Sequence, residues 1–183
     1  MLTDAFMKAL TACGGTASVA GVSTLADALC DLVSGAESAV VVPPDLDGLC
    51  AQLAERGIDC RVASRDIGAG EPLETSLRRA GVAVTRALVG IARSGTVAVG
   101  PGGGNGGLLA VLAPRHIVLL REEDIVESLA EALRVVSRGF AALGGEAVFI
   151  TGPSRTADIE MMSVIGVHGP SSLHVLVVRS EEA

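Results

Sequence analysis

The chain has 183 residues, 49% of them hydrophobic, which is enough to bury a sizeable core within one globular domain. Its formal net charge of −7 at pH 7 and its only lysine, Lys8, argue against nucleic acid as a partner, because phosphate binding needs a basic surface. With three Phe and no Tyr or Trp, the core must be aliphatic, and stacking platforms for bases are essentially lacking.

The first residues, MLTDAFMKALTACGG, do not predict a signal peptide, because no continuous apolar stretch follows a basic start. Elsewhere no apolar run reaches the roughly 18 residues of a membrane helix. The longest candidate, residues 108–120, is interrupted by Pro114, Arg115 and His116. We therefore expect a cytoplasmic protein without membrane insertion.

Apolar periodicity predicts helices and strands that alternate along most of the chain. We expect a helical N-terminal segment over 1–14, and helices over 24–34 and 45–56 that stop at Gly35 and Gly57. The region 64–80 is polar and irregular, with a short helix after Glu71 and Pro72. Strands are expected at 38–42, 58–62, 95–99, 116–120, 146–150 and 174–178.

A further helix is predicted from Asp124, where Asp124 and Glu127 resemble a capping box. Its apolar stripe steps by about one turn through Ile125, Leu129, Leu133, Val136 and Phe140. Most of the predicted strands are continuous apolar runs, as a parallel sheet covered by helices on both faces requires. We predict a single α/β domain over 1–183 with a doubly wound, Rossmann-like sheet.

The four cysteines, Cys13, Cys30, Cys50 and Cys60, form no CxxC pair, so the sequence gives no support for zinc or iron–sulfur ligation. Cys50 lies on an apolar helical stripe and Cys60 alternates with apolar strand residues, so both are interpreted as buried thiols. We expect no metal site and no cofactor in this chain.

The glycine-rich stretch GPGGGNGG (100–107) formally contains GxGxxG at Gly102, Gly104 and Gly107, as in dinucleotide-binding folds. The spacing argues against that function. Only six residues, 108–113, separate Gly107 from Pro114, too few for the crossover helix that would hold a pyrophosphate. A mobile, glycine-tolerant loop is the favoured interpretation.

The stretch TGPSRTADIE (151–160) follows the strand predicted at 146–150, so it should lie at the carboxyl end of that strand, where α/β sheets bind ligands. Ser154 or Thr156 can cap a short helix that begins near Ala157, with Asp158 in its first turn. Capping does not explain Arg155. With the backbone N–H groups from Gly152 onward, Arg155 would form a cradle for a carboxylate or phosphate.

Two further residues are candidates for acid–base chemistry. Glu160 could act as a general base or form an ion pair with Arg155. His168 could be an acid–base group, a ligand-binding group or only a turn residue beside Gly169 and Pro170. His116 and His174 stand at the starts of predicted strands and are interpreted as structural.

Three motifs, ITGPSRTADIE (150–160), GVHGP (166–170) and the block over 91–126, resemble the lactate utilization protein C family, whose members consist of a LUD domain. The resemblance covers roughly the C-terminal 110 residues well. It implies a three-layer fold similar to the sugar-phosphate isomerase and CoA-transferase group. It also implies a role in oxidising L-lactate to pyruvate with two partner proteins, of which at least one carries iron–sulfur clusters.

The expected ligand-binding residues are therefore Gly95 and Thr96 together with Gly152, Ser154, Arg155, Thr156 and Asp158. Family members commonly have an acidic residue where this chain has Arg93 and Ser94, and an Arg where it has Asn105, Gly106 and Gly107. Two alternatives stay open: an isomerase- or transferase-type enzyme acting alone on a sugar phosphate or CoA ester, and a non-catalytic module that binds a partner protein.

Overall fold

A ten-residue strand, β4 (Val82–Ile91), lies at the centre of the main sheet. A computed structural model describes residues 1–34, 39–63, 75, 80–101, 106–139, 146–157, 163–165 and 169–180. Within those residues the main sheet has nine strands, and its path β1-β11-β6-β4-β2-β3 contains only parallel pairs. The other strands of this path are β1 (Thr16–Gly21), β11 (Ser172–Arg179), β6 (Arg115–Arg121), β2 (Val40–Val42) and β3 (Cys60–Val62).

The second half of β4 leaves this parallel path. Residues 82–86 pair with β6, whereas residues 87–91 pair antiparallel with β5 (Thr96–Val99). β5 pairs antiparallel with β8 (Val148–Ile150), and β7 (Ile125–Val126) pairs parallel with the end of β4. The antiparallel pairing of β5 departs from the parallel arrangement expected for most strands. The connection after Ile91 is a tight turn, too short for a parallel crossover.

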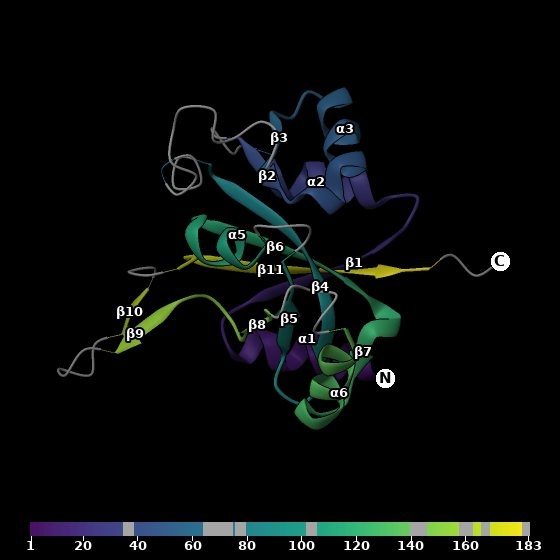
Figure 1. Ribbon diagram of the computed structural model, residues 1–183, viewed down its shortest axis with the longest axis vertical. Coiled ribbons are helices and arrows are strands. Elements are labelled where there is room, and N and C mark those ends of the chain that lie inside the picture. Colours follow the sequence, from purple (N-terminus) through teal and green to yellow (C-terminus); the bar gives the residue numbers. More distant parts are fainter. Residues whose placement is uncertain are drawn as a thin grey trace.

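Helices cover both faces of the parallel sheet (Figure 1). α2 (Leu25–Val33) and α3 (Asp47–Glu55), which follows the 3₁₀ turn Pro44–Leu46, pack on one face. α1 (Leu2–Ala12) and α5 (Gly106–Leu112) pack on the other face. α6 (Leu129–Gly139) packs against the second half of β4 and β5. The predicted three-layer α/β fold with a mostly parallel sheet is confirmed.

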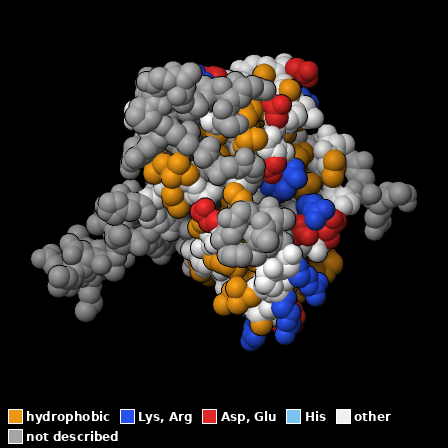
Figure 2. All heavy atoms as spheres, in the orientation of Figure 1, with side chains coloured by type: hydrophobic (Ala, Val, Ile, Leu, Met, Phe, Trp, Pro, Cys, Tyr) orange, Lys and Arg blue, Asp and Glu red, His pale blue; other side chains and the backbone are white. Residues whose placement is uncertain are grey.

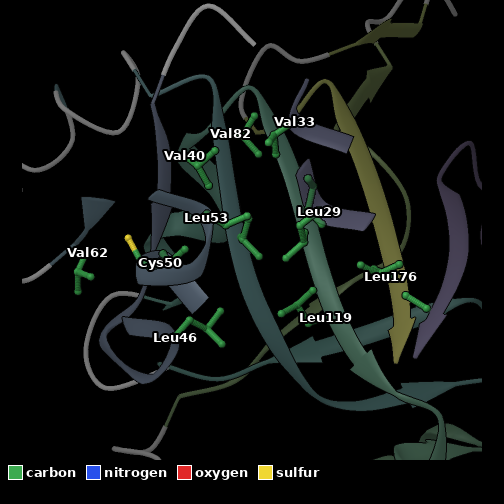
Figure 3. Close-up of a cluster of buried hydrophobic side chains, with 14 residues drawn as sticks. Leu29, Val33, Val40, Leu46, Cys50, Leu53, Val62, Val82, Leu119 and Leu176 are labelled. Atoms are coloured by element: carbon green, nitrogen blue, oxygen red, sulfur yellow. The ribbon is translucent and has the colours of Figure 1, made fainter. Parts of the chain in front are cut away.

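Alternating side chains of the strands divide the core between the two faces. In β6, Ile117 and Leu119 face α2 and α3, whereas Val118 and Leu120 face α1. Figure 3 shows the first of these clusters, in which Leu29 of α2 and Leu53 of α3 lie over the strands. Strands covered on both faces need continuous apolar runs, which is the pattern that the sequence showed.

Several elements differ from the sequence-based predictions. β1 and β4 were not predicted as strands. The helix predicted from Asp124 begins at Leu129 instead, because Asp124 ends a 3₁₀ turn (Glu122–Asp124) and Ile125 pairs with Gly90 in β7. The glycine-rich stretch does not remain a loop to its end, since Gly106 and Gly107 begin α5. A side chain at Gly106 would clash with the carbonyl of Gly100, so the close return of the chain gives this glycine a packing role.

The helix predicted near Ala157 is also wrong. Arg155–Ala157 form β9, which pairs antiparallel with β10 (Ser163–Ile165) in a separate two-stranded sheet. β-branched residues such as Thr156, Val164 and Ile165 favour this extended pairing over the cap that Ser154 or Thr156 would form. Figure 1 shows the β9–β10 ribbon projecting from the body of the molecule. In the part of the chain described, no helix is long and apolar enough to cross a membrane.

Candidate functional site

The turn between β4 and β5 lies beside the end of β8. The Gly95 N–H donates to the Ile91 carbonyl at 2.9 Å and closes the turn, in which Gly95 has a φ of 65°. β5 then pairs with β8 so that Val97 lies opposite Ile150. This register places Thr96, just before that pair on β5, next to Thr151, just after it on β8.

Three hydroxyl groups form a chain at this point. The Thr96 Oγ1 lies 2.6 Å from the Ser94 Oγ and 2.7 Å from the Thr151 Oγ1. Thr96 is buried, whereas Ser94 and Thr151 are exposed. Three hydroxyls carry three protons and the two contacts use two of them. One O–H therefore remains for a group outside this chain of hydroxyls, such as an anionic oxygen.

A groove of about 790 Å³ opens next to the hydroxyl chain. Its polar lining consists of Arg93, Ser94, Thr96, Ser128 and Thr151. Its apolar lining consists of Ile91, Leu129, Ala130, Leu133 and Phe149. Among the lining residues that the structure describes, none is acidic and Arg93 is the one cation. Of the hydrogen bonds and ion pairs within the described ranges, none involves the Arg93 guanidinium. Arg93 is thus placed to bind an anion at the hydroxyl end of the groove.

The N-terminus of α6 borders the groove but already has an anion of its own. The Glu131 carboxylate accepts the N–H groups of Glu127 at 2.9 Å and Ser128 at 3.2 Å, and the Ser128 Oγ accepts the Glu131 N–H at 3.4 Å. This is a capping box, in which the carboxylate offsets the positive end of the helix dipole. Among the described lining residues, the positive charge of the groove therefore comes from Arg93.

Gly95 and Gly152, both predicted to bind ligand, lie against the C-terminal turn of α1. Each has a positive φ, 65° at Gly95 and 77° at Gly152. A side chain at Gly95 would clash with the backbone of Leu10, and one at Gly152 with the carbonyl of Cys13. Both glycines therefore have a packing role that needs no ligand, and their binding role stays a prediction.

A model of the LUD domain matches residues 3–178 of this chain. The chain belongs to the LUD domain family. The family predicted from the sequence motifs is therefore confirmed.

Relatives and a solved structure agree with this assignment. The chain is 34% identical over 115 residues to lactate utilization protein C of Halalkalibacterium halodurans, an alignment that covers 60% of this chain and 49% of that protein. It is 35% identical over 103 residues to lactate utilization protein C of Deinococcus radiodurans, with 56% and 48% covered. The chain thus spans about half the length of these relatives.

The fold of this LUD domain is similar to the crystal structure of a DUF162 family protein from Deinococcus radiodurans. The TM-score is 0.75 over 97% of this chain and 96% of that one, at 22% sequence identity. This likeness shows the fold alone. The narrower resemblance to the sugar-phosphate isomerase and CoA-transferase group stays a prediction.

The LUD domain brings part of the predicted site together. Thr96 lines the groove, whereas Gly95 and Gly152 pack against the C-terminal turn of α1 next in sequence to the lining residues Thr96 and Thr151. The Ser154 N–H donates to the Pro170 carbonyl at 2.9 Å, which ties the TGPSR stretch to the GVHGP turn. Arg155 and Thr156 lie in β9, and their side chains are not among those described. Asp158, Glu160 and His168 lie outside the described residues.

The groove also contains residues that sequence reasoning missed. Thr151 was quoted in a motif but not paired with Thr96, because their contact depends on the β5–β8 register. Arg93 was noticed only as a departure from the family pattern. Leu129 and Leu133, which the sequence analysis placed on an apolar helical stripe, are 53% and 50% exposed and line the groove. This apolar stripe is the sequence signal that could have identified α6 as part of the groove.

The surroundings of His116 and His174 agree with their interpretation as structural residues. The His116 Nε2 lies 2.8 Å from the Thr85 Oγ1 in the core, and burial lowers the pKa of His116 to about 3. The His174 ring lies 2.8 Å from both the Thr16 and the Ser18 hydroxyls, and burial, with Arg115 nearby, lowers its pKa. Neither lines the groove.

The cysteines also agree with the sequence-based interpretation. Cys50 is buried and Cys60 is partly buried, both in the cluster beneath α2 and α3. Burial, followed by a hydrogen bond with Cys50, raises the pKa of the Cys60 thiol. Such thiols are protonated and behave as small apolar groups. Within the described ranges, no group of three or more His, Cys, Asp or Glu side chains could hold a metal ion.

Proposed function

We propose that this LUD domain acts in the cytoplasm as a subunit, without iron–sulfur clusters of its own, of a complex that oxidises L-lactate to pyruvate. The observation that carries the proposal is the similarity, at 34% and 35% identity, to two proteins named lactate utilization protein C. Oxidation of lactate to pyruvate releases two electrons and two protons. In this proposal the electrons pass to iron–sulfur clusters on partner proteins.

The groove supplies a site for the carboxylate of the substrate. Arg93 can bind a carboxylate through two parallel N–H donors, and the free O–H of the Ser94–Thr96–Thr151 chain can donate to a carboxylate or lactate hydroxyl oxygen. This moves the proposed anion site from Arg155 to the edge where Thr151 meets Thr96. Arg155 stays a candidate for a second contact from β9.

Growth on L-lactate as sole carbon source tests the role. Deletion of the gene should abolish growth on lactate but not on glucose, and the wild-type gene should restore it. Arg93→Gln should fail to restore growth, whereas Arg86→Gln, at an exposed arginine of β4 outside the groove, should restore it. Normal growth of the deletion strain on lactate would overturn the proposed function. Normal growth with Arg93→Gln would remove Arg93 from it.

A further inference from the structure

The groove beside Thr151 is larger than a three-carbon acid needs. Its volume of about 790 Å³ falls within the range of about 300–1,000 Å³ that is usual for sites of drug-sized ligands. Lactate bound at Arg93 would leave much of this volume unfilled. The apolar residues of the lining indicate which class of molecule could fill the rest.

The fold leaves large apolar side chains of the lining partly exposed. α6 buries Ala132 and Val136 against β4 and β5, which gives the helix its contact with the core. Leu129 and Leu133, one turn apart on another face, are half exposed, and Phe149 of β8 is 36% exposed. Exposed apolar residues that line one hollow mark a binding surface, whereas single exposed ones do not.

The groove combines one positive charge with a largely apolar lining. Arg93 and the hydroxyl groups of the lining supply its polar contacts, and Leu129, Leu133 and Phe149 are its large exposed apolar side chains. Figure 2 shows basic side chains gathered with hydrophobic ones at the lower end of the visible face, over α6. α6 carries Arg134 and Arg138 in addition. The described lining contains no carboxylate that would repel an anion.

We propose that the groove binds a monocarboxylic acid with an unbranched apolar chain longer than that of lactate. The carboxylate lies on Arg93 and the hydroxyl of Thr151, and the chain lies along Leu133, Leu129 and Phe149. The inference rests on the proposed function for its carboxylate end only. It adds the class of molecule, an amphiphilic acid, that this site takes.

Calorimetric titration of the full chain with butanoate, hexanoate, octanoate and decanoate, each below its micelle-forming concentration, tests the inference. Affinity should rise about fourfold for each added methylene while the groove is being filled, since burial of one methylene contributes about 0.8 kcal/mol. It should level off once the chain extends beyond the groove. The corresponding straight-chain alcohols should bind more weakly than the acids.

Variants separate the charged and the apolar contacts of the groove. Leu133→Ser should flatten the dependence on chain length, because it should weaken octanoate and decanoate more than butanoate. Val135→Ser is the matched control, because Val135 is a 41% exposed residue of the same helix that does not line the groove. Arg93→Gln should weaken all acids by a similar factor, about tenfold or more, and leave the alcohols unchanged.

The outcomes distinguish this inference from the proposed function. If Arg93→Gln weakens every acid but affinity does not depend on chain length, the amphiphilic class is overturned and the carboxylate site of the proposed function stands. If affinity depends on chain length but acids and alcohols bind equally, the carboxylate site is overturned both in this inference and in the proposed function. If no acid in the series binds, the inference is overturned, while the lactate role is decided by growth alone.

Discussion

The Thr96 Oγ1 lies 2.7 Å from the Thr151 Oγ1, although 55 residues separate the two in the sequence. The contact joins the first residue of β5 to the residue after β8 and borders the groove. Thr96 is only 6% exposed, and its hydroxyl also contacts Ser94. The contact between Thr96 and Thr151 therefore stabilises the β5–β8 pairing. It also orients the hydroxyl group that could donate to a bound anion.

Replacement of Thr96 by Val, which has a similar shape, removes the central hydroxyl of the chain. We expect Thr96→Val to lower the free energy of unfolding by about 1 kcal/mol. The loss is limited because Ser94 and Thr151 can form hydrogen bonds with water in place of those with Thr96. Thr151→Val should cost less, since Thr151 is exposed. Urea unfolding of both single variants and the double variant should give a coupling energy of about 0.5–1 kcal/mol. A coupling of zero would mean that the contact contributes nothing.

The close packing of Gly152 against the end of α1 leads to a second prediction. Gly152→Ala combines a positive φ of 77° with a clash against Cys13, whereas Gly57→Ala has a similar φ of 81° and open space. Gly57→Ala should cost about 1–2 kcal/mol from the left-handed backbone alone. Gly152→Ala should cost a further 1–3 kcal/mol or so from overpacking. Equal unfolding free energies for the two variants would show that α1 moves away without cost.

Apolar patterning was sufficient to predict the architecture but not the antiparallel edge. The strand predicted at 116–120 became β6, and 174–178 became β11, because both are buried on two faces. β4 was missed because Thr85 and Arg86 interrupt its apolar run. Nothing in a single strand reveals that β4 changes partners at Ala87, since that depends on the turn after Ile91 and on β8, far along the chain.

Among the described residues, Thr96 is the predicted ligand-binding residue that lines the groove. Gly95 and Gly152 pack against the end of α1, and their role in ligand binding stays a prediction. The charged residue was expected to be Arg155, yet the arginine that lines the groove is Arg93, brought there by the β4–β5 turn. The β9 pairing of Arg155 was missed because capping signals at Ser154 and Thr156 predict a helix locally, and strand pairing overrides them.

The start of α6 provides a direct test between two capping signals. Asp124 and Glu127 fit the capping pattern as well as Ser128 and Glu131 do, but Asp124 pairs with Arg121 at 2.7 Å instead. Ser128→Ala should lower the unfolding free energy by about 1 kcal/mol. Asp124→Ala should change it by less than about 0.5 kcal/mol, because its partner Arg121 is 59% exposed and an ion pair in contact with water contributes little. Amide exchange should report faster opening of the first turn of α6 in Ser128→Ala only, and the reverse order would contradict the assigned cap.

Burial of His116 predicts a dependence of stability on pH. The ring is fully buried, its Nε2 contacts Thr85, and its Nδ1 has no hydrogen-bond partner in the part of the chain that the structure describes. Burial lowers the pKa of His116 from 6.5 to about 3 in the folded state. Between these values the unfolded chain binds the extra proton and the folded chain does not. The contribution of His116 is therefore fully present above pH 6.5 and is lost as the pH falls through this window, with a slope approaching 1.4 kcal/mol per pH unit, roughly, for one proton.

His116→Gln removes the titration and retains a side chain that can bond to Thr85. Carboxylates titrate in the same range, so the measured quantity is the difference in unfolding free energy between wild type and variant at each pH. As the pH falls from 7 towards 4, that difference should shift in favour of the variant, at a rate set by the single proton. His174→Gln should give a smaller shift of the same sign, because His174 is only partly buried. Parallel stability curves for wild type and His116→Gln would show that His116 takes up its proton without unfolding.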